Sequence, residues 1–125
     1  MATPEAHATV HDRDGIAVIE LGGDVDGRAE RVLADAYAQA AALAPTAVVL
    51  DFTATTYINS TGIALIVGVL ARARADDREV RACGLSDHYR EIFEITRLAD
   101  FMTIVSDLAN AVGQDPREER EVSHG

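Results

Sequence analysis

Hydrophobic and polar positions along the chain form alternating short and long blocks. Short runs rich in β-branched residues predict strands at 15–21, 46–52, 78–85 and 102–106. Longer segments with apolar residues at helical spacing predict helices at 28–45, 60–75, 86–101 and 107–113, the first of them ended by Pro45. This regular alternation of strands and helices predicts an α/β domain with several parallel strands.

The helix predicted at 60–75 carries two apolar rows. One row has the spacing of a core-facing stripe: Ile63, Ile66, Val67 and Leu70. Leu65 and Val69 form a second row, displaced around the helix, and the same sheet does not bury both edges of a helix. Two interpretations follow for this second row: a docking surface that faces solvent, or one side of a deeply buried helix.

Chain length and the last residues set the domain organisation. A chain of 125 residues is long enough to bury one core, and we expect a single domain over 1–113. Residues 114–125 are polar, charged and without period, which predicts a disordered tail. The beginning of the chain lacks the basic and apolar parts of a secretory signal, and no apolar run is long enough to span a bilayer. A cytoplasmic location without membrane insertion is therefore expected.

Charge and cysteine content narrow the classes of partner. The formal net charge is −10, and the eleven basic residues, all arginines, are spread from Arg13 to Arg120. Without a basic patch, nucleic acid is a poor partner and another protein a better one. The single cysteine, Cys83, cannot form an internal disulfide and is expected at a buried strand end.

Hydroxyl side chains gather where the helix at 60–75 begins. Asn59 is a favoured N-cap, which places Ser60, Thr61 and Gly62 in the first turn. The free amides and the helix dipole favour an anion there, either a bound phosphate or a modified hydroxyl. A plain capping cluster is the other interpretation.

These residues resemble a known family. The segments "VVLDFTATTYINSTGIALIVGVLARAR" and "VRACGLSDHYREIFEITRLADFMTI" are similar to STAS domains of the anti-sigma factor antagonist type, over about Gly15 to Val112. A weaker matching element is the turn from Gly23 to Asp26. The resemblance implies a mixed, mostly parallel sheet of four to five strands packed by about four helices.

The resemblance also implies a function. In this family the first hydroxyl residue of a Ser-Ser/Thr-Gly motif, here Ser60, is phosphorylated by an anti-sigma factor that is itself a serine kinase. The unphosphorylated form binds that anti-sigma factor and frees a sigma factor, and a serine phosphatase restores it. Thr61 is the second choice for phosphorylation. The chain departs from the common motif at Asn59, where the family usually has Asp.

The partner surface expected from the resemblance and the apolar rows has nine members: Asp24, Asp26, Asn59, Ser60, Thr61, Gly62, Ile63, Leu65 and Val69. Asp24 and Asp26 have an alternative duty as turn and cap residues. A weak homodimer is also expected.

Other chemistries fit the sequence less well. An esterase elbow would need Gly where Ile58 stands, the four histidines lack ligand spacing, and no P-loop occurs. We therefore expect regulated protein binding without catalysis, metal or cofactor. The alternative is a STAS accessory subunit that binds and stabilises a membrane transporter or lipid-transport ATPase, and a nucleotide-sensing module is a third, weaker hypothesis.

Overall fold

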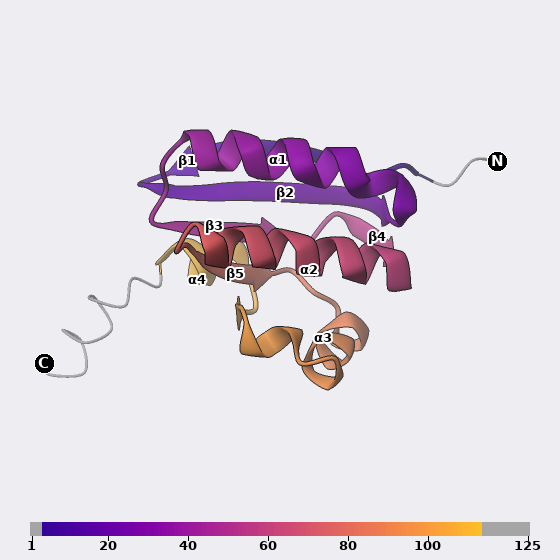
Figure 1. Cartoon of the computed structure of the whole chain (residues 1–125). Coiled ribbons are helices and arrows are strands. Elements are labelled where there is room, and N and C mark those ends of the chain that lie inside the picture. The colour runs from indigo at the N-terminus through magenta and orange to yellow at the C-terminus, as the bar shows by residue number, and fades with distance from the viewer. Residues whose placement is uncertain (1–3, 114–125) are drawn as a thin grey trace, which may run out of the picture.

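The computed structural model describes residues 4–113, which form one six-stranded sheet with helices on both of its faces (Figure 1). The strands are β1 (His7–Arg13), β2 (Ile16–Val25), β3 (Ala47–Asp51), β4 (Thr55–Ile58), β5 (Glu79–Cys83) and β6 (Thr103–Ile104). The α-helices are α1 (Glu30–Ala42), α2 (Ser60–Ala75), α3 (Asp87–Ile95) and α4 (Leu108–Gly113). Two short 3-10 helices, η1 (Gly27–Ala29) and η2 (Leu98–Asp100), precede α1 and follow α3.

The sheet is mostly parallel, with the strand order β1-β2-β3-β5-β6. Only β1 runs antiparallel, paired with β2 through the two-residue turn Asp14–Gly15. Both turn residues have positive φ, 54° and 86°, as a type I′ hairpin turn requires. The strand β4 pairs with the last residues of β2 outside this order, after a register shift between Gly23 and Asp24.

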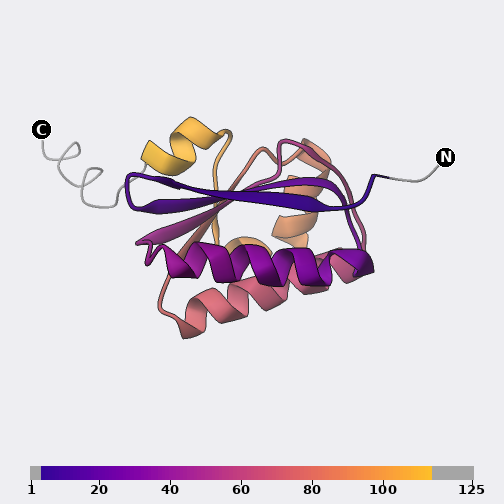
Figure 2. The ribbon, with the colours of Figure 1, turned by 90° about the horizontal axis from the view of Figure 1, so that it is seen from above.

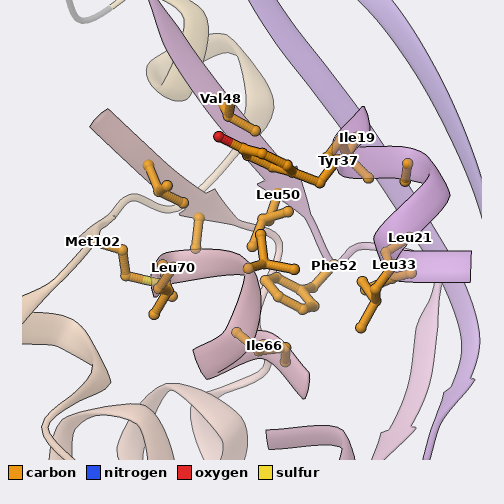
Figure 3. Packing of buried hydrophobic residues seen from close by; sticks show 14 of the residues in the cluster. Ile19, Leu21, Leu33, Tyr37, Val48, Leu50, Phe52, Ile66, Leu70 and Met102 are labelled. Atoms are coloured by element: carbon orange, nitrogen blue, oxygen red, sulfur yellow. The ribbon is translucent and has the colours of Figure 1, made fainter. Parts of the chain in front are cut away.

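The main core lies between the sheet and the helices α1 and α2, which lie side by side on one face (Figures 1 and 2). The strands β2 and β3 are buried almost throughout, which explains the apolar runs Ile16–Ile19 and Ala47–Leu50 within them. Their side chains Ile19, Leu21, Val48 and Leu50 pack with those of the helices (Figure 3). Phe93 of α3 joins the same core through an edge-to-face contact with Phe52, with ring centroids 5.8 Å apart.

The opposite face of the sheet is covered in part by α4 (Figure 2). Ala111 of α4 packs with Val18, Val49 and Cys83. The buried guanidinium of Arg81 donates to the carbonyl oxygen of Ala111 at 2.7 Å. Arg81 also forms an ion pair with Glu79 at 3.0 Å. This pair offsets the cost of burying the Arg81 charge.

The predicted fold class and four helices are confirmed, and the sheet has six strands where four to five were expected. The two strands that the apolar pattern missed are β1 and β4. The predicted third helix ends earlier, at Ile95, and the chain then continues through η2.

Cys83 is buried at the end of β5, and burial, with Asp51 nearby, raises the pKa of its thiol to about 12. Within residues 4–113, no helix has both the length and the apolar content to cross a membrane. The predicted tail lies outside the described residues.

Candidate functional site

The junction between β4 and α2 presents Ser60 at the protein surface. Asn59 is the N-cap, and its side-chain oxygen accepts a hydrogen bond from the Gly62 amide at 2.8 Å. Ser60 is the first residue of α2, and both it and Thr61 are exposed. The first amides of a helix have no acceptor within it, so this end of α2 carries a partial positive charge beside an accessible hydroxyl.

The start of α2 is fixed by a close approach to the end of β2. The Asn59 amide donates to the carbonyl oxygen of Val25 at 3.2 Å. A Cβ atom on Gly62 would collide with the same carbonyl oxygen. Only glycine fits at position 62, because any side chain would clash with β2. Gly62 therefore allows the first turn of α2 to pack directly on the backbone of β2.

The segment Gly23–Asp26, predicted as a turn, forms the end of β2 and the N-cap of η1, and it lies next to this helix start. Asp26 caps η1 by accepting from the Arg28 amide at 2.9 Å, and it also pairs with the Arg28 guanidinium at 2.9 Å. The hydrogen bonds from Arg28 lower the pKa of the Asp26 carboxyl. A Cβ atom on Gly27 would lie 3.6 Å from the Thr61 methyl group. The structure thus brings together the two sequence elements that were singled out, residues 23–26 and 59–62.

Asp24 has a different environment from Asp26. It is 9% exposed and accepts a hydrogen bond from the Thr56 hydroxyl at 2.5 Å. Its backbone amide donates to the carbonyl oxygen of Pro4 at 2.9 Å. Asp26 therefore has the cap duty that the sequence left open. Asp24 instead lies in β2, which continues to Val25 where the sequence predicted a turn after Leu21, and its hydrogen bond from Thr56 links β4 to β2.

The apolar rows of α2 require a correction. Val69 was expected on a surface for partner binding, but it is 4% exposed and packs in the core. Val67 was expected in the core stripe, but it is 45% exposed. The buried face is centred on Gly62, Ile66, Val69, Leu70 and Ala73, a rotation relative to the predicted stripe.

The rotation follows from the Gly62 contact, because the residue that lies against β2 sets the direction of the whole helix. Ile63 and Leu65 flank the buried face on its two sides and are half-buried. The exposed face instead carries Ser60, Ala64, Val67 and Ala71, at the spacing of one helical stripe. Ala64 and Val67 are surface residues beside Ser60 that the sequence analysis missed, since an apolar pattern alone cannot fix the rotation of a helix whose residues are nearly all apolar.

A further residue that the sequence analysis missed is Tyr89, on the first half of α3. Its hydroxyl accepts a hydrogen bond from the Ile58 amide at 3.0 Å, directly before the Asn59 cap. No motif in the sequence links positions 58 and 89, which are 31 residues apart. Among residues 4–113, no group of three or more His, Cys, Asp or Glu side chains is placed to hold a metal ion.

Residues 9–106 match the family model described as "Mlab, STAS domain". The chain belongs to the STAS domain family. This STAS domain is 29% identical over 103 residues to the anti-sigma-F factor antagonist RsfB of Mycobacterium tuberculosis, with 72% of this chain and 84% of RsfB covered.

Solved structures share the fold of this STAS domain. A crystal structure of an anti-sigma factor antagonist from Mycobacterium paratuberculosis has a TM-score of 0.72 at 19% identity, covering 87% of this chain and 92% of the other. The anti-sigma factor antagonist SpoIIAA in its unphosphorylated form has a TM-score of 0.61 at 17% identity, with coverages of 94% and 98%. At these identities the likeness concerns the fold alone.

Proposed function

We propose that this STAS domain is an anti-sigma factor antagonist of a partner-switching system. It binds an anti-sigma factor that is a serine kinase and so frees a sigma factor. Phosphorylation of Ser60 by that kinase ends the binding, and a serine phosphatase restores it. These steps would take place in the cytoplasm.

The observation that carries this proposal is the position of Ser60. Its exposed hydroxyl is on the first residue of α2, next to the Asn59 cap. The partial positive charge of the helix N-terminus is therefore close to this hydroxyl. RsfB, to which the chain is similar, is named an anti-sigma factor antagonist. Thr61 is exposed too, but its methyl group is near the turn at Gly27, whereas Ser60 has the position of the first hydroxyl in the family motif.

The proposed partner surface surrounds Ser60. It consists of the cap and first turn of α2, Asp24 near the end of β2, Asp26 at the cap of η1, the flanking side chains Ile63 and Leu65, and the exposed row of Ala64 and Val67. This row is apolar and has the small side chains that allow a partner's backbone to approach. A partner that covers it must also cover the Ser60 hydroxyl.

A phosphate on Ser60 would act on binding and leave the fold in place. Its charge of about −1.5 to −2 gains only about 0.3–1 kcal/mol from the helix dipole at an exposed site. In the covered surface the same charge would have to lose its water beside Ala64 and Val67. An unpaired buried charge is unfavourable by several kcal/mol, and each ~1.4 kcal/mol is tenfold in affinity.

Phosphopeptide mapping tests the proposal. The protein is incubated with ATP and each kinase-like anti-sigma factor encoded by the same genome, and the phosphorylated position is identified by mass spectrometry. We expect phosphate on Ser60, and none on Ser60→Ala. Phosphate on Ser106 with Ser60 and Thr61 unmodified would contradict the proposed site.

Constitutive binding is the outcome that would favour the alternative function. If the purified protein binds a transporter subunit with the same affinity before and after treatment with every candidate kinase, an accessory role in transport replaces the switch. The comparison of the wild-type protein with Ser60→Ala then distinguishes the two functions, because only a switch makes the variant behave differently.

A further inference from the structure

The segment that leads into Ser60 is held from two sides. The amide of Asn59 donates to Val25 in β2 at 3.2 Å, and the amide of Ile58 donates to the Tyr89 hydroxyl in α3 at 3.0 Å. Since β4 pairs with β2 on one edge, the Tyr89 hydroxyl stands where a further strand would accept a hydrogen bond on the other edge. Tyr89, 31 positions away along the chain, thus supplies the acceptor for the backbone amide directly before the Asn59 cap.

Tyr89 is itself held firmly. Its backbone amide donates to the hydroxyl of Ser86, the N-cap of α3, at 3.3 Å. Its ring is half-buried and packs against the main core, in contact with the His88 ring at a centroid distance of 5.0 Å. Ring and backbone are both fixed, so the hydroxyl is a stable acceptor for the Ile58 amide.

Removal of the Tyr89 hydroxyl adds no atoms, and the surroundings allow water to take its place. Tyr89 and Ile58 line a cavity of about 240 Å³, together with Thr55, Thr56 and Ser86. The cavity is open to solvent on one side and has room for water near the Ile58 amide. Tyr89→Phe should therefore leave the fold intact while it releases the segment before Ser60.

From this geometry we infer that Tyr89 is a positioning residue for the Ser60 switch. It fixes Ile58, Ile58 fixes the Asn59 cap, and the cap fixes the direction in which the first residue of α2 offers its hydroxyl. The first step of this inference, that Tyr89 orders the segment 58–62, rests on the structure alone. The second step, that this order promotes phosphorylation of Ser60, rests on the proposed function.

The other end of α2 supplies a matched control. There the Tyr37 hydroxyl donates to the carboxylate of Asp76, the C-cap of α2, at 2.7 Å. Tyr37→Phe therefore removes the tyrosine hydrogen bond to the C-cap of the same helix, at the end remote from Ser60, together with the longer bond that Tyr37 accepts from Arg78 at 3.4 Å. Tyr37 is only 4% exposed whereas Tyr89 is half-buried, so a general loss of stability should be at least as large in Tyr37→Phe.

Amide hydrogen exchange tests the first step without any partner. We measure the amides of Asn59 and Gly62 in the wild-type protein, Tyr89→Phe and Tyr37→Phe; the Ile58 amide is uninformative because it loses its acceptor directly. We expect exchange about tenfold faster in Tyr89→Phe only, the ratio that loss of one hydrogen bond allows. Equal exchange in Tyr89→Phe and the wild-type protein, or equal acceleration in both variants, would overturn the inference.

Steady-state phosphorylation of Ser60 tests the second step. A misdirected hydroxyl lowers the rate of transfer in the bound complex, so kcat should fall about tenfold in Tyr89→Phe with KM unchanged. Tyr37→Phe should match the wild-type protein in both constants.

If the wild-type protein is phosphorylated at Ser60 and Tyr89→Phe has the same kcat, the positioning role is wrong and the proposed function stands. If no candidate kinase modifies the wild-type protein, the proposed function fails, and the exchange of Asn59 and Gly62 still decides the role of Tyr89.

Discussion

The two ends of α2 are built in opposite ways. The C-terminal end is held by side chains: Asp76 accepts from Tyr37 at 2.7 Å and from Arg78 at 3.2 Å. The N-terminal end is fastened by backbone: Asn59 and Gly62 lie directly against the carbonyl of Val25. The side chain of Ser60 consequently takes no part in holding this end and is exposed to solvent, and Thr61 beside it is exposed too.

This difference explains how a modification could act at one end without disturbing the fold. A charge added at the C-terminal end would enter the network of Tyr37, Asp76 and Arg78 and change the packing of α1 against α2. A charge added at Ser60 would enter water, because the contacts that hold that end involve backbone atoms and the Asn59 side chain. The N-terminal end is therefore a place where surface chemistry and fold stability are separate, and the predictions below run from the largest expected loss of stability to the smallest.

Gly62→Ala should cause the largest loss. The new methyl group would collide with the Val25 carbonyl oxygen, so β2 and α2 must separate, and overpacking of this kind costs about 3 kcal/mol. Gly68→Ala on the exposed face of the same helix is the control, since a Cβ atom there meets open space. It should gain about 0.5–1 kcal/mol from helix propensity. Denaturant unfolding of both variants measures the two signs, and equal stabilities would show that the backbone contact is not what holds this end.

Tyr37→Phe should lower the free energy of unfolding by about 1–2 kcal/mol at neutral pH, because the hydroxyl donates to Asp76 at 2.7 Å and accepts a longer bond from Arg78 at 3.4 Å. Burial, reinforced by the hydrogen bond to Asp76, raises the pKa of the Tyr37 phenol above its ordinary 10.0. As pH rises above about 10, the unfolded chain releases this proton while the folded protein retains it, so the wild-type protein loses stability there. Thermal melts at increasing pH should show the advantage of the wild-type protein over Tyr37→Phe shrinking above pH 10. A constant difference would contradict the assignment of this titration to Tyr37.

Asn59→Ala should cost about 1 kcal/mol through loss of the cap on Gly62, whereas Asn59→Asp should keep the cap and change stability by only a few tenths of a kcal/mol. Asp is the residue that the family motif usually has at this position. Thermal melts of the two variants separate capping from charge. If Asn59→Asp is as unstable as Asn59→Ala, the side-chain amide has a role beyond accepting from Gly62.

Much of the fold could be predicted from the sequence, because its strongest signals are periodic. The central strands are continuously apolar and the helices have clear caps and stops, at Asn59 and Pro45 for example. The strand β1 was missed because His7–Arg13 is mostly polar and lies at the sheet edge, although the Asp14–Gly15 turn after it is typical of a hairpin. The strand β4 has only four residues, and its pairing with β2 includes a register shift. The pattern of apolar residues does not indicate such a short, irregular strand.

The site was predictable where its chemistry is local. Asn59, Ser60 and Gly62 belong to one turn, and the cap could be predicted from the residue type of Asn59. The close approach of Gly62 to Val25 is a tertiary contact and was not predicted. The rotation of α2 was not predictable, because Val67 and Val69 have the same side chain and only contact with β2 decides which one is buried. The contact between Tyr89 and Ile58 depends on where α3 docks, and a tyrosine hydroxyl that binds a distant amide leaves no pattern in the sequence.

The separation of surface chemistry from fold stability at Ser60 is tested most directly by one variant measured in two ways. Ser60→Asp should melt like the wild-type protein, because its charge lies in water at a helix N-terminus that favours anions by only about 0.3–1 kcal/mol. By titration calorimetry against the purified anti-sigma factor, the same variant should bind at least about a hundredfold more weakly, the effect of roughly 3 kcal/mol for desolvating that charge, while Ser60→Ala should bind like the wild-type protein. Ser60→Asp that binds with unchanged affinity, or that loses binding only together with its fold, would contradict the account.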